Sequence, residues 1–145
     1  DVYKRQDQDL ITKKNINMKK QIVHTEKAPQ AIGPYSQGVK YNGFIYTSGQ
    51  IPFNVEKNEL VTTGIQDEVH QVMKNVIAIL EAGGTTIDQV VKTTIFVKDL
   101  NDFNVVNEVY ASYFNDENYP ARECVEVARL PRDVNVEISV IAIAD

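Results

Sequence analysis

An arginine, a cysteine and a glutamate near the C-terminus have the types and spacing to form a small polar site. Arg122 and Cys124 are two residues apart in the segment ARECVEVARL, so on a strand their side chains share a face. Glu137 alternates with the apolar Val136 and Ile138 in the segment VNVEISVIAIA. We expect these segments to pair as neighbouring antiparallel strands, which would bring the guanidinium near the carboxylate, although the pattern does not fix the register.

This pair of charges has a functional and a structural interpretation. A guanidinium presents a planar fork of donors that matches the two oxygens of a substrate carboxylate. Glu137 could then hold or deprotonate a water molecule, or pass a proton. An ordinary ion pair between two strands would use the same two residues, so residue types alone leave both interpretations open.

Further candidates also have two interpretations each. A nucleophilic Cys124 would need a nearby base, and no histidine lies in an evident partner motif, so the alternative is a small buried apolar residue. Ser48 and Gly49 follow a predicted strand, where glycine either lets a ligand approach the backbone or forms a turn. Tyr35, in a loop with proline and glycine, either lines a pocket or anchors the loop. Asn107, inside a predicted helix where asparagine is unfavourable, either serves a site or faces solvent.

Composition excludes several classes of protein. The chain has 145 residues, 43% hydrophobic and 24% charged, which is typical of one globular domain. The net charge of −5 argues against a nucleic-acid partner, and no apolar run is long enough to cross a membrane. One cysteine and two histidines do not make a zinc motif, so we expect no metal. A single cysteine also fits a reducing compartment, and we expect a cytoplasmic protein.

The elements that must position these side chains follow from the hydrophobic pattern. Apolar residues of 65–82 form one helical stripe, which ends at Gly83-Gly84. We expect Asn101 or Asp102 to cap a second helix, with Phe103, Val106, Tyr110, Tyr113 and Phe114 on its inner face. Strands are predicted at 22–24, at 39–52 (two strands around Asn42-Gly43), at 87–100, at 121–130 and at 134–144, with a polar connection at 54–60.

This order predicts an α+β fold with two layers, in which two helices cover one face of a mixed six-stranded sheet. The other face carries Val, Ile and Ala, so we expect an oligomer that covers it. Residues 18–145 form the single domain. Residues 1–17 are polar and without sustained periodicity, and we expect them to be an extension outside the fold.

Four motifs resemble the reactive-intermediate deaminase family (RidA/YjgF): AIGPYSQG (31–38), YTSGQIP (46–52), VKTTIFVKDLNDF (91–103) and PARECVEVARLP (120–131). The resemblance extends from about residue 18 to the C-terminus. It implies a chorismate-mutase-like subunit and a homotrimer whose sheets form a central barrel, with clefts between subunits. It also implies hydrolysis of reactive 2-enamines and 2-imines, such as 2-aminoacrylate, to 2-keto acids and ammonia, without a cofactor.

The resemblance also assigns roles to residues. Arg122 matches the family's carboxylate-binding arginine, and Glu137 matches the glutamate that positions the hydrolytic water. The positions that match the lining of the substrate-binding cleft are Tyr35, Ser48, Gly49, Asn107 and Cys124. Two other functions stay open: a non-catalytic binder of small carboxylates or chaperone-like protein, and an endoribonuclease that inhibits translation.

Overall fold

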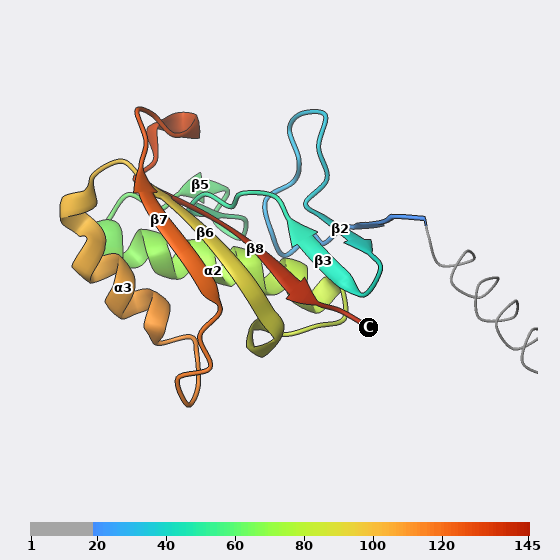
Figure 1. Ribbon diagram of the computed structural model, residues 1–145. Helices are drawn as coiled ribbons and strands as arrows, with labels where there is room; N and C mark the ends of the chain where they lie inside the picture. The colour runs from blue at the N-terminus through green and yellow to red at the C-terminus, as the bar shows by residue number, and fades with distance from the viewer. Residues whose placement is uncertain (1–18) are drawn as a thin grey trace, which may run out of the picture.

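A single six-stranded sheet forms the frame of the molecule, with strand order β1-β2-β3-β8-β6-β7 (Figure 1). The computed structural model describes residues 19–145, and the expected extension of residues 1–17 lies outside that range. The six strands are β1 (Gln21–Val23), β2 (Gly38–Tyr41), β3 (Phe44–Thr47), β6 (Val90–Val97), β7 (Ala121–Glu126) and β8 (Val136–Ile143). β6 lies between β7 and β8, as expected for a strand rich in β-branched residues.

Two helices, α2 (Ile65–Ala82) and α3 (Phe103–Ala111), pack against one face of this sheet (Figure 1). The predicted stripe of α2 lies in the core, where Val69, Val72, Met73, Val76 and Leu80 are buried. On α3, Val106 and Tyr110 are buried, whereas Phe103 lies at the surface. The predicted two-layer α+β fold with a mixed six-stranded sheet is therefore confirmed.

The predicted pairing of the last two strands is wrong. β7 pairs in parallel with β6, and β6 pairs antiparallel with β8, so β6 separates the strand of Arg122 from the strand of Glu137. The physical reason is the helix α3 between β6 and β7. A strand, a crossover helix and a second strand form a parallel unit, which places β7 beside β6 and not beside β8.

Several shorter elements also differ from the expectation. Residues 54–60, predicted as a polar connection, belong to a small antiparallel hairpin of β4 (Phe53–Asn54) and β5 (Glu59–Leu60). The strand predicted at 87–100 is shorter, because residues Ile87–Gln89 form a 3-10 turn, η1, before β6. The strand predicted at 121–130 ends at Glu126, as β7. Two further 3-10 turns, η2 (Leu100–Asp102) and η3 (Pro131–Asp133), precede α3 and β8. Asp102, one of the two predicted caps, is the N-cap residue of α3, although its side chain makes no capping hydrogen bond.

The second face of the sheet carries exposed apolar side chains. Tyr46 pairs with Ile141 and Phe44 with Ile143, so these side chains lie on the face opposite the helices. Within residues 19–145, no helix lies over this face, which is turned towards the viewer in Figure 1. The oligomer expected to cover it stays a prediction. Among the described helices, none has the length and apolar character needed to span a bilayer.

Candidate active site

Arg122 is held on the helix side of the sheet by residues of α3. It pairs with the buried Thr93 of β6, and side chains of paired residues share a face. The Arg122 Nη1 donates a hydrogen bond of 2.5 Å to the Asn107 Oδ1. The guanidinium carbon also lies 5.6 Å from the ring centroid of Phe103 and 5.4 Å from that of Tyr110, within the range of cation–π attraction.

The helical repeat explains why α3 provides these three neighbours. Phe103, Asn107 and Tyr110 are separated by four and then three residues, so they form one stripe along the helix. The Tyr110 hydroxyl donates to the Thr93 Oγ1 at 2.9 Å, which ties the helix to β6. Burial raises the pKa of Tyr110, so the phenol stays protonated and available as a donor. Asn107 is therefore turned towards Arg122 and not wholly towards solvent, and its role in a site stays a prediction.

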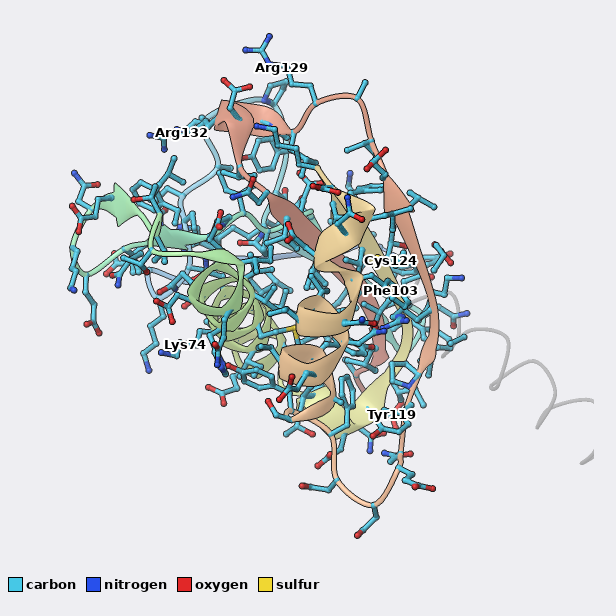
Figure 2. The ribbon with its side chains drawn as sticks, turned by 90° about the vertical axis from the view of Figure 1, so that its left-hand side faces the viewer. Lys74, Phe103, Tyr119, Cys124, Arg129 and Arg132 are labelled. Atoms are coloured by element: carbon cyan, nitrogen blue, oxygen red, sulfur yellow. The ribbon has the colours of Figure 1, made fainter. Side chains whose placement is uncertain are left out.

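The positive charge of Arg122 has no carboxylate partner within residues 19–145. Lys92 pairs with Glu123 and Arg129 with Asp133, and no acidic oxygen lies within 4.0 Å of the Arg122 guanidinium. The guanidinium lines a pocket of about 290 Å³ together with Asn107, Tyr110, Ala111, Tyr119 and Pro120. In Figure 2, which has α3 in the foreground, Phe103 and Cys124 are labelled beside β7 and Tyr119 lies below them. The strand-to-strand ion pair considered from the sequence is not formed.

Cys124 shares the face of Arg122, as predicted from their spacing. It pairs with the buried Ile95 and packs against the core. Burial raises the pKa of the Cys124 thiol, and the Arg122 charge opposes that rise without cancelling it. A thiol with a raised pKa is a poor nucleophile at neutral pH, so Cys124 is better suited to packing beside the arginine.

Glu137 lies on the other face of the sheet. It pairs with Phe96, which is three residues from Thr93 along β6, so its side chain points away from the helices. The carboxyl is half-buried, and its desolvation raises the pKa of Glu137 above the ordinary value. No side chain or backbone group among residues 19–145 hydrogen bonds to this carboxyl, so its oxygens can contact a water molecule or ligand.

Gly49 leaves the space that the Glu137 carboxyl occupies. A Cβ atom at Gly49 would lie 2.6 Å from both the Cδ and the Oε2 of Glu137, which is closer than real contacts allow. The ladder between β3 and β8 pairs Tyr46 with Ile141, and pairing resumes at Gln50 with Ile138. One strand therefore has an extra residue between these pairs, and this bulge brings Gly49 to the carboxyl.

Ser48 and Tyr35 lie near Gly49, Ser48 as its neighbour in the chain and Tyr35 in the same pocket lining. The Ser48 hydroxyl donates to the Ser36 carbonyl at 2.5 Å, and the Ser48 backbone amide donates to the Gln37 carbonyl at 2.9 Å, which ties the bulge to the loop before β2. Tyr35, in that loop, is 50% exposed and lines a pocket of about 600 Å³ together with Gly49.

The candidate residues thus form two groups in one chain. The arginine half-site consists of Arg122, Asn107 and Cys124, and the glutamate half-site consists of Glu137, Gly49, Ser48 and Tyr35. The groups lie on opposite faces, two strand spacings apart, which is roughly 10 Å across the sheet. In Figure 2, Arg132, which lines the Tyr35 pocket, is labelled well apart from Cys124.

Sequence reasoning assigned Phe103 and Tyr110 to the core and missed their contact with Arg122. Their spacing around Asn107 was the signal that could have identified them. Among residues 19–145, no group of three or more His, Cys, Asp or Glu side chains is arranged to hold a metal ion.

Comparisons with known proteins agree on one family. A family model described as Endoribonuclease L-PSP matches residues 25–144. The Escherichia coli protein named 2-iminobutanoate/2-iminopropanoate deaminase is 52% identical over 123 residues, which cover 83% of this chain and 95% of that protein. The Yersinia pestis Rid-family protein YyfA superimposes with a TM-score of 0.84 at 48% identity, covering 86% of this chain and 99% of that one. Escherichia coli TdcF, crystallised with bound serine, superimposes with a TM-score of 0.81 at 44% identity, also covering 86% of this chain and 99% of that one.

Proposed function

Because this chain belongs to the RidA/YjgF family, whose family model is described as Endoribonuclease L-PSP, we propose that it hydrolyses reactive 2-imino and 2-enamino acids to 2-keto acids and ammonia. The observation that carries the proposal is the Arg122 guanidinium, which lines a pocket and has no carboxylate partner among residues 19–145. Among the relatives, the Escherichia coli protein bears the name of such a deaminase.

Arg122 binds the substrate carboxylate. Asn107 accepts a hydrogen bond from the Nη1 atom, and the two aromatic rings lie close to the guanidinium without neutralising it. An anion that enters the pocket therefore gains a charge-assisted and potentially bidentate interaction. A small 2-imino acid has its C=N carbon next to that carboxylate, so binding at Arg122 also fixes the position of the reacting carbon.

Glu137 positions the water that attacks this carbon. Its carboxyl has no protein hydrogen-bond partner among the described residues, and its raised pKa makes it a better proton acceptor than an ordinary glutamate. The water adds its oxygen to the carbon, and the imine nitrogen is protonated to give a carbinolamine. The C–N bond then breaks, ammonia leaves, and the carbon retains the oxygen as a keto group. This sequence consumes one water and needs no cofactor.

The two half-sites must come from different copies of the chain. Arg122 and Glu137 point to opposite sides of one sheet, so a small substrate cannot contact both in one protomer. The exposed apolar face that carries Phe44, Tyr46 and Ile143 provides a surface for self-association. We therefore propose a homotrimer in which Arg122 of one copy faces Glu137 of another across a cleft.

The test couples the purified protein to a pyridoxal-phosphate dehydratase that releases 2-aminoacrylate from serine. The expected result is faster disappearance of the imine absorbance and faster formation of pyruvate and ammonia. If the keto acid forms at the uncatalysed rate over a range of protein concentrations, the proposed activity is rejected. Binding of a small carboxylate at Arg122 without acceleration would then identify a carboxylate binder.

RNA cleavage is the second candidate, because the matching family model carries the description of an endoribonuclease. The net charge of −5 disfavours it, since RNA backbone binding relies on clustered Lys and Arg. An RNA-cleaving activity would favour this function over the deaminase if it co-purified with the protein and persisted in the Arg122→Ala variant.

A further inference from the structure

The pocket beside the glutamate half-site has features that the proposed chemistry at the C=N bond does not require. Its volume is about 600 Å³, within the range of pockets that hold whole small molecules. The substrate 2-aminoacrylate has only a methylene group beyond its reacting carbon. The pocket therefore provides more space than that substrate needs.

The pocket adjoins the position of Glu137 through Gly49, although Glu137 itself does not line it. Gly49 lines the pocket, and the Glu137 carboxyl lies directly against its Cα, where a Cβ would collide. Gln50 also lines the pocket, and its backbone pairs with Ile138, the residue after Glu137. A substrate with its reacting carbon at Glu137 can therefore extend its side chain into this space.

The walls of the pocket favour an apolar group. The apolar residues that line it are Pro29, Ile32, Ile51, Phe53 and Val55, and Ile32 is 87% exposed, so the pocket presents apolar surface to solvent. The charged lining residues are Glu26 and Arg132, whose opposite signs leave the lining without net charge. A charged side chain would therefore gain little there, whereas an apolar one would remove lining surface from water.

Arg132 and Phe53 fix one wall of this space. The Arg132 guanidinium carbon lies 5.4 Å from the ring centroid of Phe53. Arg132 has a left-handed backbone, with φ 56° and ψ 21°, which is costly for a residue other than glycine. The neighbouring Arg129 is paired with Asp133, so in this turn it is Arg132 that projects over the pocket.

We propose that this pocket receives the substrate side chain, so that the enzyme prefers 2-imino acids with extended apolar side chains to 2-iminopropanoate and 2-aminoacrylate. The proposal rests on the proposed deaminase function and adds the substrate class to it. Val55, Ile32 and the Phe53–Arg132 wall are then the residues that determine specificity.

The test compares imines generated from alanine, leucine and glutamate by amino-acid oxidases of matching specificity. The wild-type kcat/KM, relative to each uncatalysed rate, is expected to be roughly tenfold or more higher for the leucine-derived imine than for the alanine-derived one. Val55→Trp, which fills the pocket, should remove about tenfold of the activity on the leucine-derived imine and leave the alanine-derived imine within about twofold. Val61→Trp is the matched control, because Val61 lines a different pocket on the other side of the hairpin.

The outcomes separate this proposal from the function on which it rests. If the alanine-derived imine is accelerated but the leucine-derived one is not preferred, or if Val61→Trp has the same effect as Val55→Trp, the pocket assignment is wrong and the deaminase stands. A preference for the glutamate-derived imine also overturns the apolar assignment. No acceleration with any imine overturns both. Should Val55→Trp fail to fold, Ile32→Ser at an exposed position gives the same test, with an expected loss of about threefold on the leucine-derived imine alone.

Discussion

The arginine half-site and the glutamate half-site are built in opposite ways. Asn107 holds Arg122 by a hydrogen bond, and two rings of α3 flank it, so its geometry is fixed within one chain. Glu137 has no hydrogen-bond partner among residues 19–145, and Gly49 provides the space beside it. The difference shows that the guanidinium is held in place by its neighbours, whereas the carboxyl keeps its acceptor oxygens available.

This contrast suggests a division of the work between the two half-sites. An arginine held by neutral neighbours keeps its full charge for a substrate anion. A desolvated carboxyl with a raised pKa keeps its basicity for a water proton. Substitutions in each half-site should therefore change different parts of the kinetics.

The largest effect is expected for Arg122→Ala. The substitution removes the guanidinium that we propose binds the carboxylate, so kcat/KM for 2-iminopropanoate should fall on the order of 100- to 1,000-fold. The oligomeric state, measured by light scattering, should stay the same. Arg129→Ala is the matched control, because Arg129 is exposed and paired with Asp133, and it should keep full activity. Unchanged turnover by Arg122→Ala would remove the arginine from the site.

Glu137→Gln should lower kcat by about 100-fold with a smaller change in KM, because loss of a general base slows the chemical step. The wild-type rate should fall as the pH decreases through the pKa of Glu137, which burial raises, so the fall begins at a higher pH than for an ordinary glutamate. The Gln variant should lack this limb of the pH profile. A wild-type profile in the variant would exclude Glu137 from the chemistry.

The same substitution has a signature in stability. Because the folded-state pKa of Glu137 is raised, folding favours the protonated carboxyl, and this stabilisation is lost as the pH rises through that pKa. Glu137→Gln should therefore melt at a slightly higher temperature than the wild type at neutral pH, and the difference should shrink towards acidic pH. If the carboxyl serves the reaction at a cost in stability, the Glu137→Gln variant should be both more stable and slower than the wild type.

Mixing the two defective chains tests whether the half-sites come from different copies. In a ring of randomly mixed Arg122→Ala and Glu137→Gln chains, about one quarter of the clefts contain an intact arginine and an intact glutamate. Co-expression should therefore restore about a quarter of the wild-type activity, well above either parent. The double variant, with both changes in one chain, should restore nothing when mixed with either. Absence of recovery in verified mixed oligomers would place both half-sites of each cleft in one copy.

The sequence predicted the local structure better than the strand pairing. The stripe of α2 and the stop after Ala82 depend on contacts within a few turns, which the apolar spacing records. The pairing of Arg122 with Glu137 depended on the order of strands in the sheet. The short connection at 130–133 resembled the turn of a hairpin between the last two strands. The helix between β6 and β7 instead imposes a parallel crossover, and this non-local rule decided the strand order.

The site residues show the same limit. The two-residue spacing placed Cys124 beside Arg122 correctly, because alternation on a strand is local. The contact between Asn107 and Arg122 joins two different elements, 15 residues apart, so the local pattern did not decide between solvent and a site. The polar residues of 54–60 concealed the small hairpin that begins with Phe53, a wall of the second pocket.

A smaller effect is expected at Asn107. Asn107→Ala removes one hydrogen bond to a charged group, so KM for the imine should rise about tenfold while kcat changes little. Asn107→Asp should also weaken carboxylate binding, because it pairs the guanidinium with a competing charge. Asn104→Ala, on the exposed side of the same helix, is the control and should leave both constants unchanged. A fall in kcat without a rise in KM would contradict the assigned positioning role.

The smallest effect is expected at Cys124. Burial raises the pKa of the thiol despite the neighbouring Arg122, so little thiolate exists at neutral pH and a covalent step has no activated nucleophile. Cys124→Ala should therefore keep kcat/KM within about threefold of the wild type, with the remaining loss due to looser packing beside the arginine. Cys124→Ser keeps nearly the same volume and should lie closer to the wild type. If both variants lose activity as completely as Arg122→Ala, the thiol takes part in the reaction, and the arginine half-site does more than bind the carboxylate.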